Sequence, residues 1–499
     1  MMSLPKEYKS FVNSNFYKDN PLPKLEKVYA NNKDEKLINS ISEVFDKLAI
    51  KDGMTLSFHH HLRNGDYVLN LVLEEIKNRN LKNITLAPSS IFPVHNSLCE
   101  LIENKNVTNI YTNYLNGPVA NTINAGHLEG LLIMDTHGGR SVAIESGNIK
   151  IDVAFIACPT TDKLGNGHGR SGKSACGSLG YAIPDMYYAK NKVLITDNLV
   201  DEVVDPEIKA EFIDYIVAID SIGDKDRIVS GTTKITKDPI GLRIADETAK
   251  LIDALGLIKN GFSMQTGAGG TSLAVSDYVK KIMIEKNIKA AFASGGITGY
   301  FVNMLEENLV DELFDVQCFD LSAVESIDRN KKHHSISAFK YANPYHDPIV
   351  NKLDFVILGA TEIDLNFNVN VTTGSNGIIM GGSGGHADTA HGANVSIIVS
   401  PLIKSRIPII KDRVTTITTP GEDIDIFVTE RGIAINPKRT DLIEKLKNSK
   451  IKLKTIAELY EEAHLITSVP KKIIRSDKII GLVRYRDMTI IDCIYKKEE

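Results

Sequence analysis

Residues 262–301 read FSMQTGAGGTSLAVSDYVKKIMIEKNIKAAFASGGITGYF. Glycines at 267–270 come just ahead of a helical pattern over 272–285, and glycines at 295–296 follow the apolar run 290–293. Short apolar runs that alternate with helical patterns are typical of a mostly parallel sheet covered on both faces. This stretch therefore predicts an α/β fold.

The same alternation continues on both sides of this stretch. An amphipathic helix is expected over residues 34–49, because apolar residues recur there at helical spacing. The other elements expected before residue 221 are the helix 67–77 and the strands 54–58, 84–87, 153–157, 193–196 and 215–219. After residue 238 we expect the helices 244–255 and 272–285 and the strands 290–293, 314–319, 355–358 and 396–399.

Two hairpins and one polar loop complete the expected organisation. Pro420 and Gly421 predict a tight turn between antiparallel strands at 413–419 and 424–428, and the tail predicts a second hairpin over 479–484 and 488–494. The polar loop 221–238 is typical of a domain boundary. We therefore expect an N-terminal arm (1–30) and two α/β domains (31–232 and 233–499). Each domain should hold a mostly parallel sheet flanked by helices, and the second should end in the C-terminal hairpin.

The composition excludes several classes of protein. The 499 residues are 42% hydrophobic and 24% charged, which excludes wholesale disorder, and the formal net charge of −5 argues against a general nucleic-acid-binding surface. The sequence contains neither a secretory signal nor an apolar stretch long enough to cross a membrane. Its five cysteines form no CxxC pair. We therefore expect a reduced, cytoplasmic setting with no nucleic-acid or membrane partner.

Three glycine-rich segments lie where predicted strands meet predicted helices, at residues 267–270, 295–296 and 381–385. Glycine lets backbone N–H groups approach a ligand without a side chain in the way. At the start of a helix such N–H groups also favour negative charge. The three segments therefore predict a shared anion or oxyanion pocket at the strand ends.

Two formal motif matches give rival interpretations. Residues 167–174 match the phosphate-loop pattern, but no apolar strand directly precedes them and the residues that follow are poor helix formers. Residues 381–385 match the nucleophile elbow of hydrolases around Ser383, but the next predicted strand leaves little room for the long helix that such an elbow needs. Neither a nucleotide triphosphatase nor a serine hydrolase is favoured, although both stay as alternatives.

Histidines raise the question of a metal. Of the consecutive histidines at 59–61 at most two can converge on a strand, and His386 and Asp388 are poorly spaced for one helix face. We therefore expect no metal site, and hydrogen bonds to loops explain these side chains. The segment with His60 and Arg63 joins a strand to a helix start, which suits a polycarboxylate, but a solvated loop would explain it nearly as well.

The segment TGSNGIIMGGSGGHADTAHGA (373–393) resembles the CoA-transferase superfamily, as does FVTERGIAI (427–435). Three further segments resemble the family of citrate lyase α subunits: NGPVANTINAGHLEG (116–130), DVAFIACPTTDKLGNGHG (152–169) and VRYRDMTIIDCIY (483–495). The resemblance covers nearly the whole chain. One departure is Met488, which stands where the terminal turn of that family usually has glycine.

The resemblance implies two CoA-transferase-like domains and an exchange of acyl groups on a thioester. Acetyl thioester and citrate would give citryl thioester and acetate. The thiol would belong to a CoA-derived, phosphopantetheine-type arm on the small acyl-carrier (gamma) subunit, so no cofactor is expected on this chain itself. A separate beta subunit would then split the citryl thioester, and the whole would form a multi-subunit oligomer.

Many members of the superfamily carry a glutamate that becomes a covalent thioester, and the resemblance aligns it with residues 294–297. No carboxylate stands there, and the nearest is Glu306. We therefore expect citrate to supply its own carboxylate, with no covalent acyl-enzyme. The protein would hold both acyl groups in contact and stabilise the oxyanions that form.

The residues predicted to carry this chemistry are mostly glycines. The predicted catalytic framework is Gly295, Gly296, Gly382 and Gly384. The predicted substrate-binding residues are Arg63, His60, Gln265, Asn376, Gly381 and Gly385. Replacing Gly382 by valine is expected to remove most turnover and leave the fold intact. Alternatives are a transferase for citramalate or another acid, a thioester hydrolase, and a non-catalytic scaffold that docks the carrier.

Overall fold

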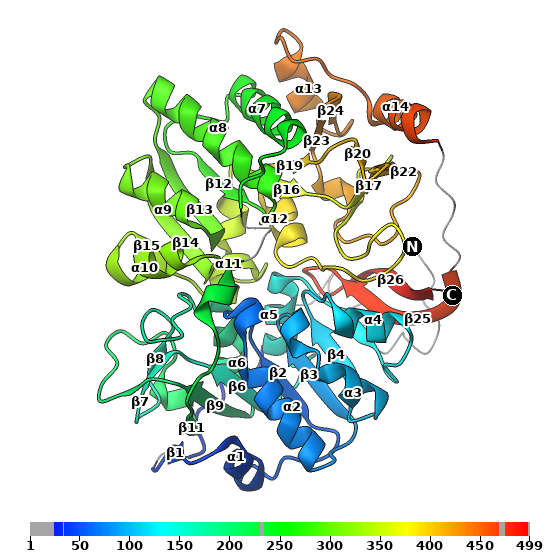
Figure 1. Cartoon of the computed structure of the whole chain (residues 1–499). Coiled ribbons are helices and arrows are strands. Elements are labelled where there is room, and N and C mark those ends of the chain that lie inside the picture. Colours follow the sequence, from blue (N-terminus) through cyan, green and yellow to red (C-terminus); the bar gives the residue numbers. More distant parts are fainter. Residues whose placement is uncertain (1–23, 33, 230–233, 469–474, 498–499) are drawn as a thin grey trace.

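The computed structural model describes residues 24–32, 34–229, 234–468 and 475–497. Two large sheets, each flanked by helices, form the lower and upper halves of the molecule in Figure 1. Most neighbouring strands in both sheets run parallel. The predicted α/β class with two mostly parallel sheets is therefore confirmed.

The first sheet belongs to the lower half. In the described part of the chain its order is β1 (Leu37–Ile38), β11 (Tyr215–Ala218), β9 (Asn191–Thr196), β6 (Val153–Ala157), β2 (Thr55–Phe58), β3 (Ile84–Pro88), β4 (Val107–Thr112), β5 (Leu132–Met134), β25 (Arg475–Arg484) and β26 (Ile490–Lys497). The helices of this half are α1 (Ile41–Lys47), α2 (Val68–Asn78), α3 (Leu98–Glu103), α4 (Pro118–Asn124), α5 (His137–Glu145) and α6 (Ile183–Tyr188).

The second sheet belongs to the upper half. Its order is β15 (His333–Ser335), β14 (Val310–Cys318), β13 (Ala290–Ile297), β12 (Ser263–Thr266), β16 (Phe355–Gly359), β19 (Val395–Val399), β23 (Ile426–Thr429) and β24 (Gly432–Ile435). The helices of this half are α7 (Pro239–Ala254), α8 (Gly270–Lys286), α9 (Gly299–Glu306), α10 (Leu321–Arg329), α11 (Ala338–Ala342), α12 (His386–Gly392), α13 (Thr440–Leu446) and α14 (Ile456–Thr467).

Small sheets border the two large ones. One contains β10 (Leu199–Val200), β7 (Thr160–Asp162) and β8 (Gly167–His168), and a second contains β18 (Val369–Asn370), β17 (Glu362–Asp364) and β22 (Ile410–Lys411). A two-stranded sheet pairs β20 (Ile403–Lys404) with β21 (Ile407–Pro408). Within the described ranges, no helix is both long enough and apolar enough to cross a membrane.

The sequence pattern explains the main elements. Helix α2 buries Val68, Val72 and Ile76 among others, at the spacing of one helix face. Every residue of β6 is buried, as expected for a central strand of a parallel sheet with helices on both faces. The predicted strand 153–157 and the predicted helix 67–77 agree with β6 and α2 within one residue.

The C-terminal hairpin forms as predicted but joins the first sheet. Strand β25 pairs in parallel with β5 and antiparallel with β26. In the turn between β25 and β26, Met488 has a φ of +73°, a left-handed conformation that favours glycine. The predicted domain boundary at 232–233 lies outside the described residues and stays a prediction. The C-terminal tail, which was assigned to the second domain, pairs with the sheet of the first half.

The expected N-terminal arm is described only in part. Residues 1–23 lie outside the described residues. Beyond them the backbone N–H of Leu25 donates to Glu145, and that of Val28 donates to Tyr187, so this stretch runs along the first half.

Two expected elements differ from the structure. The helix predicted over 34–49 begins only at Ile41, because residues 37–38 pair with β11 as a strand. The hairpin predicted at 413–428 is wrong, because β23 pairs with β24 instead. Backbone N–H groups in 413–419 have other partners. Those of Thr415 and Ile417 donate to the buried carboxylates of Glu362 and Asp492, and those of residues 418 and 419 donate to the carbonyl of Val369, so they do not form the predicted hairpin ladder.

Candidate active site between the two sheets

The glycine segment 381–385 of the second half lies directly on the first half. Leu115 donates its N–H to the carbonyl of Gly381 over 3.2 Å, and His137 donates its N–H to the carbonyl of Gly384 over 2.8 Å. The N–H of Gly384 donates to the carbonyl of Asn113 over 3.2 Å. Residues 381–385 therefore bring the carboxyl ends of both sheets together at one place.

Close backbone approach explains the glycines of this segment. A Cβ on Gly382 would lie 2.2 Å from the carbonyl oxygen of Asn113, and a Cβ on Gly381 would lie 2.4 Å from that of Val371. A Cβ on Gly385 would lie 2.4 Å from the hydroxyl of Tyr341. The expectation that a valine at 382 leaves the fold intact is therefore wrong, because its side chain meets rigid backbone of the other half.

The sequence suggested that Gly295 and Gly296 follow a strand, but they lie inside β13. They stand at a register shift in the pairing of β13 with β14. Gly295 has a φ of +107°, and a Cβ there would lie 2.6 Å from the amide of Gln265. A Cβ on Gly296 would lie 2.2 Å from the ring of Phe319. A side chain at either position would therefore have to displace Gln265 or the Phe319 ring.

Gln265 and Tyr341 connect the two glycine segments. The side-chain amide of Gln265 donates to the hydroxyl of Tyr341 over 2.8 Å, and its oxygen accepts from Ser294 over 3.1 Å. Tyr341, in the short helix α11, packs against Gly385. Burial raises the pKa of the Tyr341 hydroxyl well above its usual value, so it stays protonated. Sequence reasoning found Gln265 but missed Tyr341.

His60 belongs to a buried ring cluster beside the same glycines. Its ring lies 4.8 Å from the ring centre of Tyr181 and 5.7 Å from that of His137, and the His137 ring lies 4.2 Å from Tyr181. A Cβ on Gly384 would lie 3.3 Å from Nε2 of His137. His137 and Tyr181 were not predicted, since neither stands near His60 in the sequence.

The imidazoles of this cluster are neutral. Burial, helped by neighbouring cations, lowers the pKa of His60 and His61 well below the usual value and that of His137 to about 3. His60 Nδ1 bonds to Ser89 Oγ over 2.5 Å, and His61 accepts the N–H of Tyr181 over 3.3 Å. These neutral rings can donate or accept hydrogen bonds without a fixed charge.

Arg63 supplies a cation at the edge of the cluster. Its guanidinium lies 4.8 Å from the ring centre of Phe319, the same ring that fills the space beside Gly296. Arg63 has a φ of +51°, a conformation that costs free energy in residues with a side chain and that clusters at functional sites. Burial lowers its pKa, but the group stays protonated at any physiological pH.

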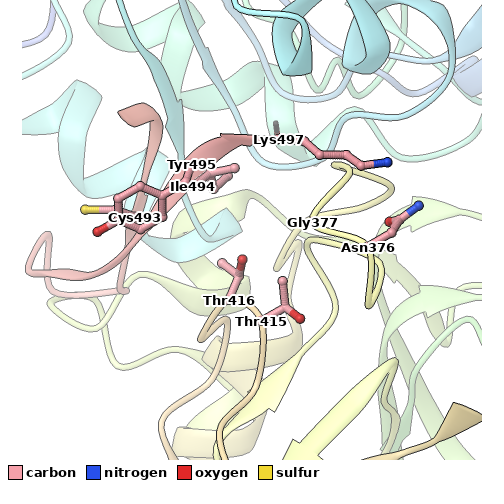
Figure 2. Close-up of a pocket in the computed structure, with 8 residues that line it drawn as sticks. All are labelled: Asn376, Gly377, Thr415, Thr416, Cys493, Ile494, Tyr495 and Lys497. Atoms are coloured by element: carbon pink, nitrogen blue, oxygen red, sulfur yellow. The ribbon is translucent and has the colours of Figure 1, made fainter. Parts of the chain in front are cut away.

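Asn376 lies apart from the other predicted site residues. It is exposed in a turn, and its side-chain oxygen accepts the N–H of Ile378 over 3.2 Å. Figure 2 shows it at the edge of a small pocket together with Thr415, Thr416 and the end of β26. Its role in substrate binding stays a prediction.

The alternative sites have ordinary structural partners. Ser383 Oγ accepts the N–H of Ala387, and the Lys173 ammonium donates to the carbonyl of Asp220. The ring of His386 lies between Thr419 Oγ1 and the carbonyl of Gly359. In the part of the chain that the structure describes, no group of three or more His, Cys, Asp or Glu side chains could hold a metal ion.

Solved structures are similar to the chain in fold. It superposes with a TM-score of 0.96 on a citrate lyase alpha subunit from Streptococcus mutans, which was crystallised with citrate, at 45% identity over 99% of each chain. A malonate decarboxylase alpha subunit from Acinetobacter baumannii gives a TM-score of 0.62 at 16% identity, over 86% of this chain and 88% of that one, which shows a shared fold alone.

Sequence comparisons agree with this likeness. The chain is 46% identical to the citrate lyase alpha chain of Haemophilus influenzae, over 96% of both proteins. It is 44% identical to that of Escherichia coli, over 94% of this chain and 92% of the relative. A family model described as citrate lyase, alpha subunit, matches residues 34–497. With the family model matched from β1 to the end of β26, the chain belongs to the family of citrate lyase alpha subunits.

Proposed function

We propose that this chain is a citrate CoA-transferase that exchanges acetyl for citryl on a thioester, without an acyl group on the enzyme. The observation that carries the proposal is the lack of a carboxylate where the superfamily resemblance would put a glutamate. Residues 294–297 hold none, and Gln265 and the Phe319 ring occupy the space beside Gly295 and Gly296. The attacking carboxylate therefore comes from the substrate.

The exchange needs two substitutions at carbonyl carbons. A carboxylate oxygen of citrate attacks the acetyl carbonyl, the C–S bond breaks, and the thiolate leaves. The thiolate then attacks the citryl carbonyl of the mixed anhydride. The bond from that carbonyl to the bridging oxygen breaks, and acetate leaves with an oxygen atom that came from citrate. Atoms and charge balance without an oxidant or an enzyme nucleophile.

In this proposal the protein positions the reactants and stabilises the two oxyanions. Backbone N–H groups of Gly381, Gly382 and Gly385 would donate to the reacting carbonyls, where one preorganised donor is worth about 2.7–4 kcal/mol. The N–H of Gly384 bonds to Asn113, so Gly384 contributes close approach to His137 instead. Holding both acyl groups in contact supplies much of the remaining rate.

Citrate is the proposed acid because a cation and neutral hydrogen-bonding rings lie beside the glycine segments. Arg63 would pair with one carboxylate, and His60 and His137 would bond to the others or to the hydroxyl. The relative from Streptococcus mutans was crystallised with citrate, which supports this choice of substrate.

The thioester partner is proposed to be a CoA-derived arm on a gamma subunit. A beta subunit would then split the citryl thioester, as expected for one member of a multi-subunit citrate lyase. The glycine segments of the second half would receive the end of the arm, and this chain would carry no covalent cofactor itself.

The test uses the purified full chain with acetyl-CoA as a substitute for the carrier thioester. With citrate present we expect citryl-CoA and acetate in equal amounts, and no acetate without citrate. Citramalate in place of citrate should react more slowly. Acetate release without citrate would favour a hydrolase. Faster exchange with citramalate would mean that citramalate is the substrate, and no exchange even with the carrier thioester would favour a scaffold. Each of these results overturns the proposal.

A further inference from the structure

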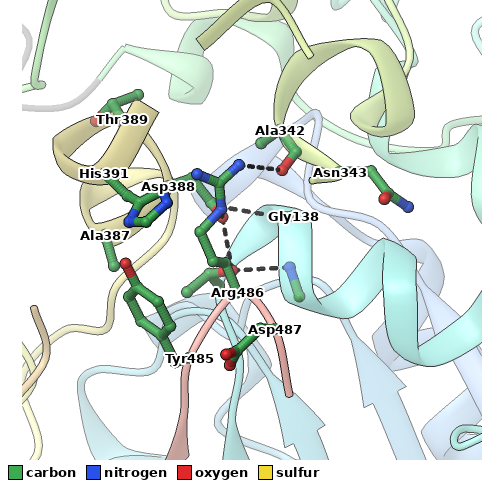
Figure 3. Close-up of polar contacts among 12 residues, drawn as sticks. Gly138, Ala342, Asn343, Ala387, Asp388, Thr389, His391, Tyr485, Arg486 and Asp487 are labelled. Carbon is green, nitrogen blue, oxygen red and sulfur yellow. Dashed lines mark hydrogen bonds and ion pairs between the residues drawn. The ribbon is translucent and has the colours of Figure 1, made fainter. Parts of the chain in front are cut away.

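A buried acidic residue of the second half holds the start of a helix in the first half. Asp388 lies in α12, three residues after Gly385, and is fully buried. Its carboxylate accepts hydrogen bonds from Thr136 Oγ1 and from the N–H of Gly138, both over 2.9 Å (Figure 3). These groups begin α5, where a carboxylate is stabilised by the helix dipole.

A buried cation from the C-terminal hairpin faces this carboxylate. Arg486 Nε lies 3.8 Å from Asp388, and Arg486 Nη2 donates to the carbonyl of Ala342 over 3.3 Å. The two side chains are 3% and 0% exposed. Figure 3 shows Arg486 reaching from the hairpin turn between α12 and the end of α11. The pair therefore joins four segments that are far apart in the sequence: the start of α5, the end of α11, α12 and the hairpin turn.

The partners of this pair are direct neighbours of the site residues. Thr136 and Gly138 flank His137, whose N–H donates to Gly384 and whose ring faces Gly384. Ala342 follows Tyr341, whose hydroxyl packs against Gly385. Asp388 thus fixes the residues on both sides of His137, and Arg486 fixes the residue next to Tyr341.

The side chains and backbone around Asp388 and Arg486 are closely packed. A Cβ on Gly138 would lie 2.2 Å from the carbonyl oxygen of Ala342 and 2.6 Å from the Asp388 carboxylate. If Asp388 lost its charge, Arg486 would be a buried cation without its counter-charge. Removing one partner of a buried ion pair is strongly destabilising, so we expect the surrounding segments to shift. The shift would move His137 relative to Tyr341.

We propose that Asp388 and Arg486 are positioning residues that set the separation of His137 and Tyr341 around Gly384 and Gly385. This inference rests on the proposed function, because it takes these glycines as the place of the exchange. Asp388 and Arg486 touch no substrate. They act through the two side chains that frame the glycines.

The test compares kcat and KM of the full chain after the substitutions Asp388→Asn and Arg486→Met. A misplacement of about 1 Å in a reacting group costs about 100-fold in rate. We therefore expect kcat to fall about 100-fold in the folded variant, while KM for acetyl-CoA stays within about threefold. The double variant should lose no more than the worse single variant, because both residues serve one arrangement.

Two further variants keep the test decisive. Asp214→Asn removes a similar buried carboxylate outside the site. The Asp214 carboxylate accepts two backbone N–H groups and lies 3.7 Å from the Lys192 ammonium, so the kcat of this variant should stay normal. Thr136→Val removes one hydrogen bond of Asp388 and the N-cap hydrogen bond that Thr136 Oγ1 accepts from Gly139. It is expected to fold even where Asp388→Asn fails, and it should lower kcat.

If the wild type is active and either the folded Asp388→Asn variant or the Thr136→Val variant has a normal kcat, this inference alone is overturned. Inactive wild type overturns the proposed function instead. An equal loss of kcat in Asp214→Asn would mean that general destabilisation causes the effect, which also overturns the inference.

Discussion

Gln265 donates a hydrogen bond to the hydroxyl of Tyr341 over 2.8 Å, and this pair lies between Gly295 of one strand and Gly385 of the segment that docks on the other half. Gln265 fills the space beside Gly295, and Tyr341 fills the space beside Gly385. The two glycine segments therefore border one polar centre although they are distant in the sequence. Both glycines are needed because the two side chains approach so closely.

Tyr341→Phe should weaken the exchange and leave the fold largely intact. The substitution removes the acceptor of the Gln265 amide, and an unsatisfied buried group costs about 1–3 kcal/mol. We expect about a tenfold lower kcat and a modestly lower melting temperature. Tyr300→Phe removes a half-buried hydroxyl elsewhere and should change neither kcat nor KM. Unchanged kcat in Tyr341→Phe would remove the pair from the site.

Gly296→Ala should impair both packing and rate. Its Cβ would lie 2.2 Å from the Phe319 ring, so the ring must move, and overpacking of this kind costs about 1–3 kcal/mol. The moved ring also displaces Arg63, so the citrate KM should rise. Gly359→Ala is the matched control, because no atom lies within 4 Å of a Cβ there. Steady-state kinetics of both variants, with thermal unfolding, measure the difference.

Arg63→Met should affect citrate more than the thioester. A charge-assisted hydrogen bond is worth about 1.5–3 kcal/mol, so we expect the citrate KM to rise about 10- to 100-fold. The KM for acetyl-CoA should change little. Arg79→Met, which removes a cation that pairs with Asp46 and Glu75 outside the site, should leave both values unchanged. Equal changes in both KM values after Arg63→Met would contradict a citrate-specific role.

Acid should destabilise the folded chain through its neutral histidines. The folded-state pKa of His137 is lowered to about 3 from 6.5, mainly by burial. Between these values the unfolded chain binds a proton that the folded chain does not, so stability falls as pH falls. The slope is about 1.4 kcal/mol per pH unit for this histidine. Denaturant unfolding at pH 7 and pH 5 should show a smaller pH dependence in His137→Gln than in wild type.

Local pattern was enough for much of the fold. Helix α2 and strand β6 have strong periodicity and uniform burial, so their bounds follow from the sequence. The hairpin expected at 413–428 failed because buried carboxylates from distant segments, such as Glu362, take its N–H groups. Such tertiary partners leave no local signal.

The site was predicted only in outline. The glycine segments stand out by composition, and Gln265 stands next to one of them. His137 and Tyr341 come from a helix start and a short helix, and only the docking of the two halves brings them to Gly384 and Gly385. The resemblance between the glycine segments and a known family gave no hint of Tyr341, and a contact map from related sequences could have found it.

The most direct test of the exchange route follows oxygen atoms through a single turnover. The chain is mixed with acetyl-CoA and with citrate that carries heavy oxygen in its carboxylates, and the chain is in excess over citrate. If citrate itself attacks the acetyl group, the first acetate released carries heavy oxygen, and the intact protein gains neither acetyl nor CoA mass. If the first acetate carries only ordinary oxygen and the protein gains CoA as a thioester of a carboxylate such as Glu306 or Asp388, or if the protein gains an acetyl group on Ser383, an enzyme nucleophile is at work and the account is contradicted.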